Sequence, residues 1–221
     1  TNERIKAYIT AFPSKKSLLL DYYCERHEVW QQTDKYFGVP YIWCYLGNFG
    51  GNTVLVGNLY DINKRLENTF ANGGKNFEGL GSTLEGFDCN PFVYNYVFEK
   101  AWDIDVPRWT EELAVRRIGR DNAKGKTAWK LLIDSIYADP SRPGQCAMLS
   151  IRPTFGKFKT YYANPRFRYS NKTLLSILGL MLEADGKGTS YSFDVVNVTR
   201  QLLGNYSKTT KRLIRKATLK P

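Results

Sequence analysis

Residues 40–52 read PYIWCYLGNFGGN, and this stretch decides the fold. Its first seven residues are almost uniformly apolar, which is typical of a strand in a covered parallel sheet. The residues at 47–52 then predict a loop, followed by a helix from about residue 53 to 70. The same apolar pattern occurs at 17–24, SLLLDYYC, and a third strand, weakened by two glycines, is expected at 77–84. This alternation of strand, loop and helix predicts an α/β fold.

Helical spacing of apolar residues predicts that helices surround and follow these strands. They are expected at 2–12, 91–102, from 107 onward, and at 127–137, 174–182 and 192–203. Residues 139–168 are rich in Pro, Gly, Arg and Tyr and are expected to be irregular. Because the strands fade after about residue 103, we place an α/β domain at 1–103 and an all-α domain at 104–221. Three strands cannot close an eight-stranded barrel, so the first part is expected to be the end of a larger domain with bare sheet edges.

Composition describes a folded and strongly basic chain. Of the 221 residues 43% are hydrophobic and 24% are charged, which argues against overall disorder, and the formal net charge is +11. Residues 208–221 supply six basic side chains and no acid, so we expect a basic tail that is either solvated or bound to a polyanion. No apolar run is long enough for a membrane span, and residues 1–10 lack the apolar core of a signal peptide.

Cysteine and histidine usage argues against a metal site. The chain has Cys24, Cys44, Cys89 and Cys146, with no CxxC pair, and His27 is its one histidine. The cysteines are expected to be thiols, mostly buried. The spacing does not support a zinc site, and a single histidine weakens any Ser-His-Asp or Cys-His scheme. No metal and no cofactor is expected.

Polar and aromatic side chains follow the expected strands at the edge where active sites of α/β folds lie. Glu25 follows the first strand, Trp43 and Asn48 lie at or after the end of the second, and Glu85 follows the third. Rings stack on sugar faces, amides and carboxylates bind hydroxyls, and paired carboxylates cleave glycosidic bonds. Other interpretations remain open on position alone, since a carboxylate at a strand end also caps helices and a tryptophan also packs in cores.

Several of these segments together resemble one family. They are 41–52 (YIWCYLGNFGGN), 79–86 (GLGSTLEG), 113–119 (LAVRRIG), 128–132 (AWKLL), 152–153 (RP) and 194–201 (DVVNVTRQ). In this order they resemble alpha-N-acetylglucosaminidases of glycoside hydrolase family 89, over about residues 1–206. The resemblance implies the C-terminal portion of a (β/α)8 TIM-type barrel followed by an all-α domain. After Tyr206 the sequence does not resemble the family's continuation, so a divergent or truncated end is expected.

The resemblance also implies a chemistry. Family members are retaining hydrolases that use two carboxylates, and Glu85 matches the family's nucleophile. The substrate implied is terminal alpha-linked N-acetylglucosamine of heparan-type or related glycans, and the location implied is lysosomal, periplasmic or secreted. Asn2-Glu3 mimics the dipeptide that carries the family's acid/base, but Glu3 begins a helix, so the acid/base is expected to be absent from this chain. Residues that match pocket-lining segments are Trp43, Cys44, Asn48, Phe49 and Trp109.

Two other functions remain as alternatives. One is a polyanion-binding module that uses the basic tail at 208–221; nucleic acid is not expected as a partner, because no aromatic residues are interleaved with the basic residues of the tail. The other is an inactive truncated product whose exposed sheet edges lead to aggregation. The sequence indicates a carbohydrate substrate as the main partner and does not specify an oligomeric state.

Overall fold

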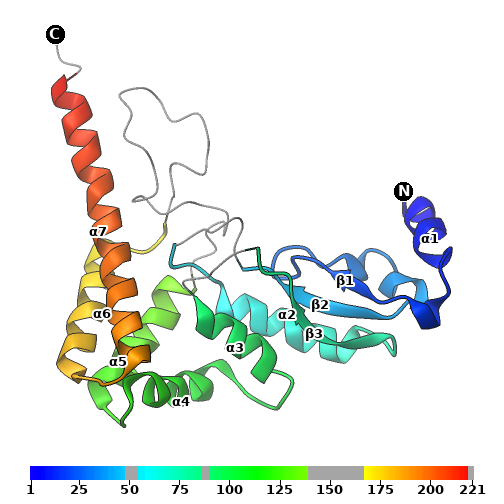
Figure 1. Cartoon of the computed structure of the whole chain (residues 1–221), viewed down its shortest axis with the longest axis horizontal. Coiled ribbons are helices and arrows are strands. Elements are labelled where there is room, and N and C mark those ends of the chain that lie inside the picture. Colours follow the sequence, from blue (N-terminus) through cyan, green and yellow to red (C-terminus); the bar gives the residue numbers. More distant parts are fainter. Residues whose placement is uncertain (48–53, 86–89, 139–166, 219–221) are drawn as a thin grey trace.

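The computed structural model describes residues 1–47, 54–85, 90–138 and 167–218, without the side chains of residues 215 and 216. A parallel sheet lies toward one end and a bundle of helices toward the other (Figure 1). No helix in the described ranges is long and apolar enough to cross a membrane.

The sheet has three described strands: β1 (Leu19–Asp21), β2 (Tyr41–Tyr45) and β3 (Phe77–Ser82). They are parallel in the order β1-β2-β3, with Asp21 opposite Trp43 and Cys44 opposite Gly81. The predicted α/β class and the three parallel strands are confirmed. The first strand was predicted to reach residue 24 but ends at Asp21. Tyr23 has a positive φ of 73°, which is incompatible with extended backbone.

The two faces of the sheet are covered to different extents within the described residues. Tyr41 and Trp43 point toward α2 (Leu59–Asn72) and are fully buried, and the Tyr41 hydroxyl donates to the Gly73 carbonyl at 3.0 Å. On the other face Leu20 is 57% exposed. On that same face Cys44 is only 1% exposed, so within the described residues the second face is buried near the carboxyl end of β2 and open beside β1.

The remaining helices are α1 (Asn2–Thr10), α3 (Pro91–Glu99), α4 (Val106–Ile118), α5 (Ala123–Leu131) with a π turn at Leu132–Ile136, α6 (Asn171–Ala184) and α7 (Thr189–Thr218). Polar caps move two helix starts away from the predicted positions. Asn58 accepts a hydrogen bond from the amide of Asp61, so α2 begins at Leu59 rather than near 53. Asn122 accepts from the amide of Gly125, so α5 begins four residues earlier than predicted.

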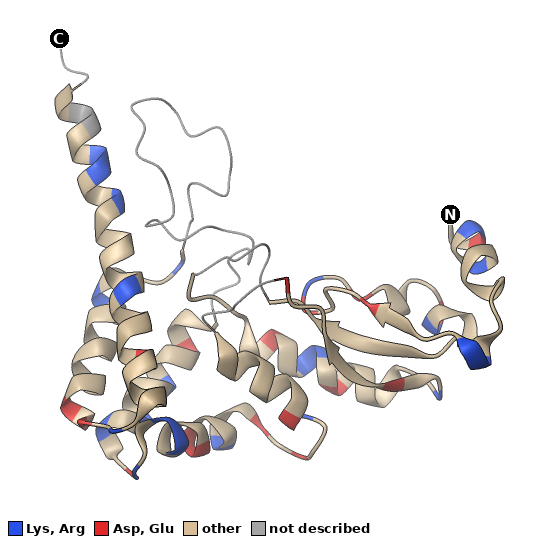
Figure 2. Cartoon of the chain, viewed as in Figure 1, with Lys and Arg blue, Asp and Glu red and all other residues tan. Residues whose placement is uncertain are grey.

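The basic tail is mostly helical, which corrects the expectation of a separate solvated segment. Helix α7 continues without interruption to Thr218 and carries Lys208, Lys211 and Arg212 on its outer half (Figure 2). No Pro or Gly occurs between Gly204 and Pro221, and the intervening residues include several strong helix formers. A solvated tail was expected because the segment is highly charged, although its residues favour a helix.

One hydrophobic core runs through both the strand-rich and the helical parts. It includes Trp43 and Leu66 near the sheet and Trp109, Trp129 and Ile177 in the helical part, each at most 1% exposed. Helices α4 and α7 are also tied by an ion pair in which the Nε of Arg117 donates to Asp194 at 2.8 Å. The Arg117 guanidinium lies 6.0 Å from the ring centre of Trp129.

Leu66 tests the packing of α2 on the sheet. Its side chain is fully buried, so Leu66→Ala should lower the free energy of unfolding by about 2–5 kcal/mol in urea titrations. Leu182→Ala is the matched control, because Leu182 is 57% exposed and its loss should cost less than about 0.5 kcal/mol. Equal effects of the two substitutions would contradict the assigned core.

Candidate active site

The three chain segments that leave the strands meet at the carboxyl end of the sheet. Pairing continues past the strands, since the Cys24 amide donates to the Cys44 carbonyl and the Thr83 amide donates to the Tyr45 carbonyl, each at 3.0 Å. Residues 22–25, 44–47 and 83–85 are thereby held side by side. This edge is where α/β enzymes place their reacting groups.

Glu85 lies at this edge, three residues beyond the end of β3, and its side chain is exposed to solvent. The hydroxyl of Tyr22 donates a hydrogen bond to its Oε1. Within the described residues Glu85 forms no ion pair. The carboxylate is therefore accessible to solvent and held by one hydrogen-bond donor.

Tyr22 was not singled out by the sequence, although it follows the last residue of a strand. It is 44% exposed, and the hydrogen bond to Glu85 raises its pKa above the ordinary value of 10, with smaller contributions from desolvation and from the charges of Glu85 and Glu25. The alternation of side chains along an extended strand could have placed it on the face opposite to Asp21.

The other residues that match pocket segments lie in different surroundings. Cys44 is at the same edge and 1% exposed, and burial raises the pKa of its thiol to about 11. Trp43 points to the opposite, buried face, where its Nε1 donates to Glu28 at 3.0 Å. Trp109 lies in α4, is 1% exposed, and donates through Nε1 to Glu99 at 2.7 Å. The positions of the last two predicted residues, Asn48 and Phe49, lie outside the described residues.

Glu25 holds the turn that leads away from β2. Its buried carboxylate accepts hydrogen bonds from the amides of Gly47 at 2.7 Å and Leu46 at 3.2 Å. Burial raises the pKa of the Glu25 carboxyl to about 7, although these two amides act in the opposite direction. Gly47 has a φ of +72°, and a Cβ there would lie 2.5 Å from the hydroxyl oxygen of Tyr94, so only glycine fits.

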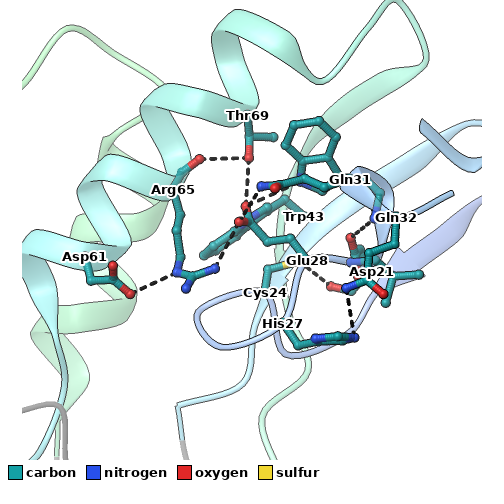
Figure 3. A network of polar contacts seen from close by, with 12 residues as sticks. Asp21, Cys24, His27, Glu28, Gln31, Gln32, Trp43, Asp61, Arg65 and Thr69 are labelled. Atoms are coloured by element: carbon teal, nitrogen blue, oxygen red, sulfur yellow. Dashed lines mark hydrogen bonds and ion pairs between the residues drawn. The ribbon is translucent and has the colours of Figure 1, made fainter. Parts of the chain in front are cut away.

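A second buried carboxylate, Glu28, joins the β1–β2 connection to β2 and α2 (Figure 3). It accepts hydrogen bonds from the indole Nε1 of Trp43 and from Arg65 of α2, each at 3.0 Å. Its remaining donors are the side chains of Trp30, Gln31 and Thr69. Sequence reasoning missed Glu28, because its donors extend as far as Thr69, 41 positions further along the chain, and no local pattern connects them.

The carboxylate of Asp21 fixes the same connection from the end of β1. It accepts from the backbone amides of Trp30 at 3.0 Å and Val29 at 3.2 Å, and the Cys24 thiol donates to its carbonyl at 3.0 Å. Burial raises the pKa of Asp21, while its hydrogen bonds oppose the shift. Asp21, the last residue of β1, is therefore a buried acceptor that shapes the backbone.

The segment after the β2 loop is clamped by the helical part of the chain. The Leu55 amide donates to the side-chain oxygen of Gln201 in α7 at 2.9 Å, and its carbonyl accepts from the Tyr169 hydroxyl at 3.2 Å. Asn90, the N-cap of α3, donates to the Val54 carbonyl at 3.1 Å and accepts from the Tyr137 hydroxyl at 2.6 Å. Residues 54 and 55 are thus held by hydrogen bonds from α7, from Tyr169 and from the start of α3.

Among the described residues no group of three or more His, Cys, Asp or Glu side chains could hold a metal ion. What gathers at the carboxyl end of the sheet is one exposed carboxylate, a tyrosine hydroxyl and a protonated thiol. Such a set can attack an electrophilic carbon and donate hydrogen bonds to hydroxyl groups.

A parallel sheet with a carboxylate at its carboxyl edge, followed by a helical part, is the arrangement of an α/β enzyme with an attached helical domain. The chain belongs to the alpha-N-acetylglucosaminidase family: residues 1–104 match the model of its TIM-barrel domain and residues 109–220 match the model of its C-terminal domain. The second match reaches residue 220, which corrects the expectation that the sequence departs from the family after Tyr206.

Individual relatives agree with this assignment. The human protein alpha-N-acetylglucosaminidase is 30% identical over 205 residues, covering 90% of this chain and 27% of the human one. A family 89 glycoside hydrolase from Clostridium perfringens, solved with PUGNAc, has a TM-score of 0.82 and 22% identity over 95% of this chain and 25% of its own. A structure of CpGH89 from the same organism, with its substrate GlcNAc-alpha-1,4-galactose, has a TM-score of 0.77 and 23% identity over 90% of this chain. The chain therefore spans about a quarter of the length of these relatives.

Removal of the Glu28 carboxylate should destabilise the chain strongly. Glu28→Ala leaves Arg65 and the Trp43 indole without their buried acceptor, so we expect a loss of about 3–5 kcal/mol of unfolding free energy. In the control, Glu112→Ala, an exposed ion pair with Arg108 is lost at a cost below about 1 kcal/mol. A loss from Glu28→Ala no larger than that of the control would show that the network does not hold the connection.

Glu25 should make stability depend on pH. Because its pKa rises from an ordinary 4.5 to about 7 on folding, the folded state binds the proton more tightly. The contribution is complete below pH 4.5 and is lost as pH rises through 7, by up to about 3 kcal/mol. Unfolding titrations of the wild type and of Glu25→Gln should show this difference between the two proteins. A difference that stays constant, or changes in the opposite direction, would contradict the burial of an ionisable group here.

Proposed function

We propose that the protein is a retaining glycoside hydrolase that releases terminal alpha-linked N-acetylglucosamine, with Glu85 as its nucleophile. The observation that carries the proposal is the exposed Glu85 carboxylate, oriented by Tyr22 at the carboxyl end of β3 in a member of this family. The name of the human relative and the bound GlcNAc-alpha-1,4-galactose of the Clostridium relative support the sugar and its linkage. Heparan-type or related glycans are the proposed source of that terminal sugar.

The chemistry of the alpha linkage favours a carboxylate nucleophile. In an alpha-linked N-acetylglucosamine the 2-acetamido group is on the same side as the leaving group, so it cannot attack the rear face of C1. In the proposal a Glu85 oxygen forms a bond to C1 as the C1–O bond to the leaving group breaks, and the leaving oxygen takes a proton from a second carboxylic acid. Water then attacks C1 and gives a proton to the carboxylate left by that acid, while the C1–O bond to Glu85 breaks and its electron pair returns to the Glu85 carboxylate. The alpha configuration is retained after two inversions.

Only one of the two carboxylates is assigned within this chain. Glu3, the neighbour of Asn2, lies exposed in the first turn of α1, before the first strand. We therefore propose that the acid/base is a residue outside residues 1–221. The proposal keeps a domain boundary near residue 103. We propose that Cys44 lines the floor of the sugar-binding pocket, and that the buried Trp43 and Trp109 support the pocket from the core.

Polyanion binding by the tail has less support. Residues 208–218 form the end of α7 and lie within the match to the family's C-terminal domain, so they do not form a separate appended segment. An inert truncated product is also less well supported, because the described residues share one continuous core.

Azide rescue tests the nucleophile directly. Glu85→Gly should abolish hydrolysis of an activated aryl alpha-N-acetylglucosaminide by the protein that carries this chain, because no group remains to attack C1. Added azide should restore release of the phenol and give the beta-glycosyl azide, since azide attacks once with inversion. Proton NMR of the product gives its configuration.

Glu99→Gly is the control, since Glu99 is a carboxylate of the helical part that hydrogen-bonds to Trp109. It should show no azide product. Azide rescue absent in Glu85→Gly, or an alpha-configured azide product, would remove Glu85 from the role of nucleophile.

A further inference from the structure

We propose that Tyr22 is a positioning residue for Glu85: it holds one carboxylate oxygen and leaves the other free to attack the sugar. This inference rests on the proposed function, because it assigns a role to the neighbour of the proposed nucleophile. Tyr22 follows β1 and Glu85 follows β3, and these strands lie on opposite sides of β2 (Figure 1). The hydrogen bond therefore spans the width of the described sheet.

The side chains between the two residues make this span possible. Leu20 lies opposite Ile42, so Tyr22, two residues further on, is on the same face as Cys44, which in turn lies opposite Gly81. Along this row the side chains change from a long tyrosine to a small thiol and then to none. A Cβ on Gly81 would lie 3.1 Å from the Cys44 sulfur and 2.9 Å from Ile42, so the row is filled to contact without one. The phenol can therefore extend over β2 and reach Glu85.

The hydrogen bond divides the roles of the two carboxylate oxygens. Tyr22 donates to Oε1, and within the described residues no hydrogen bond or ion pair occupies Oε2. A donor to Oε1 fixes the rotation of the carboxylate group, so that Oε2 is presented to C1 before the reaction begins. When water later cleaves the covalent ester, negative charge returns to Glu85, and the same hydroxyl stabilises it.

A purely structural role fits Tyr22 less well. The residue is 44% exposed, so its ring contributes little buried area. The raised pKa of its hydroxyl is caused first by the hydrogen bond to Glu85 and only then by desolvation. The interaction thus consists mainly of one charge-assisted hydrogen bond between Tyr22 and Glu85.

The pair itself can be tested without catalysis. In the chain labelled with 13C at the Cζ atoms of tyrosine, the Tyr22 resonance is assigned by its absence from Tyr22→Phe. This resonance should report a pKa of Tyr22 above the ordinary value of 10, and the pKa should move back toward 10 in Glu85→Gln. Asp134→Asn is the matched control: burial and then the hydrogen bond to Asp134 raise the pKa of Tyr60 to about 12, so this variant should lower the pKa of Tyr60 in part and leave Tyr22 unchanged. Identical titration of Tyr22 in the wild type and in Glu85→Gln overturns the proposal.

Kinetics then test the positioning role. In the protein that hydrolyses the aryl glycoside, Tyr22→Phe should lower kcat about tenfold while KM changes less than about twofold, since the hydrogen bond acts on Glu85 rather than on the sugar. An unchanged kcat overturns the positioning role and leaves Glu85 as nucleophile intact. Failure of azide rescue in Glu85→Gly overturns the proposed function instead, so the two failures are distinguishable.

Discussion

The buried carboxylate of Glu28 is the interaction on which the arrangement of the sheet depends. A carboxylate removed from water is costly unless its lone pairs are satisfied, and here donors from the β1–β2 connection, from β2 and from α2 all converge on it. Arg65 supplies the opposite charge at 3.0 Å. Since the donors come from three separate segments, the cost of burying Glu28 is offset only when those segments have already assembled. This makes the strand order and the position of α2 mutually dependent.

This constraint extends to the site at the other end of the strands. Trp43, which donates to Glu28, and Cys44, which lies near the carboxyl end of the sheet, are neighbours on β2 with side chains on opposite faces. Any rotation or slip of β2 that displaces Trp43 from Glu28 also moves Cys44 and the turn that Glu25 holds through Gly47. The packing on the buried face therefore fixes the geometry on the open one.

Sequence predicted the three strands, their parallel direction and that Glu85 follows the third, because each of these follows from apolar runs and from what lies after them. It did not predict Glu28 or Tyr22, whose partners are distant in sequence and are brought close only by strand pairing. Helix starts were misplaced where one asparagine side chain, Asn58 or Asn122, decides the first turn. The end of α7 was missed because its basic composition resembles that of an unstructured tail, although nothing in it interrupts a helix.

The clamp on Leu55 gives the helical part a role beyond support. Gln201 of α7 and Tyr169 bind the two backbone groups of one residue in the connection that leaves β2, from positions more than a hundred residues further along the chain. Chimeras of related enzymes that exchange the two parts at residue 103 would separate these partners. A chimera that keeps the clamp must therefore take residues 54–60 from the same parent as the helices. The segment that has to be exchanged as one piece thus begins within the strand-rich part of the chain.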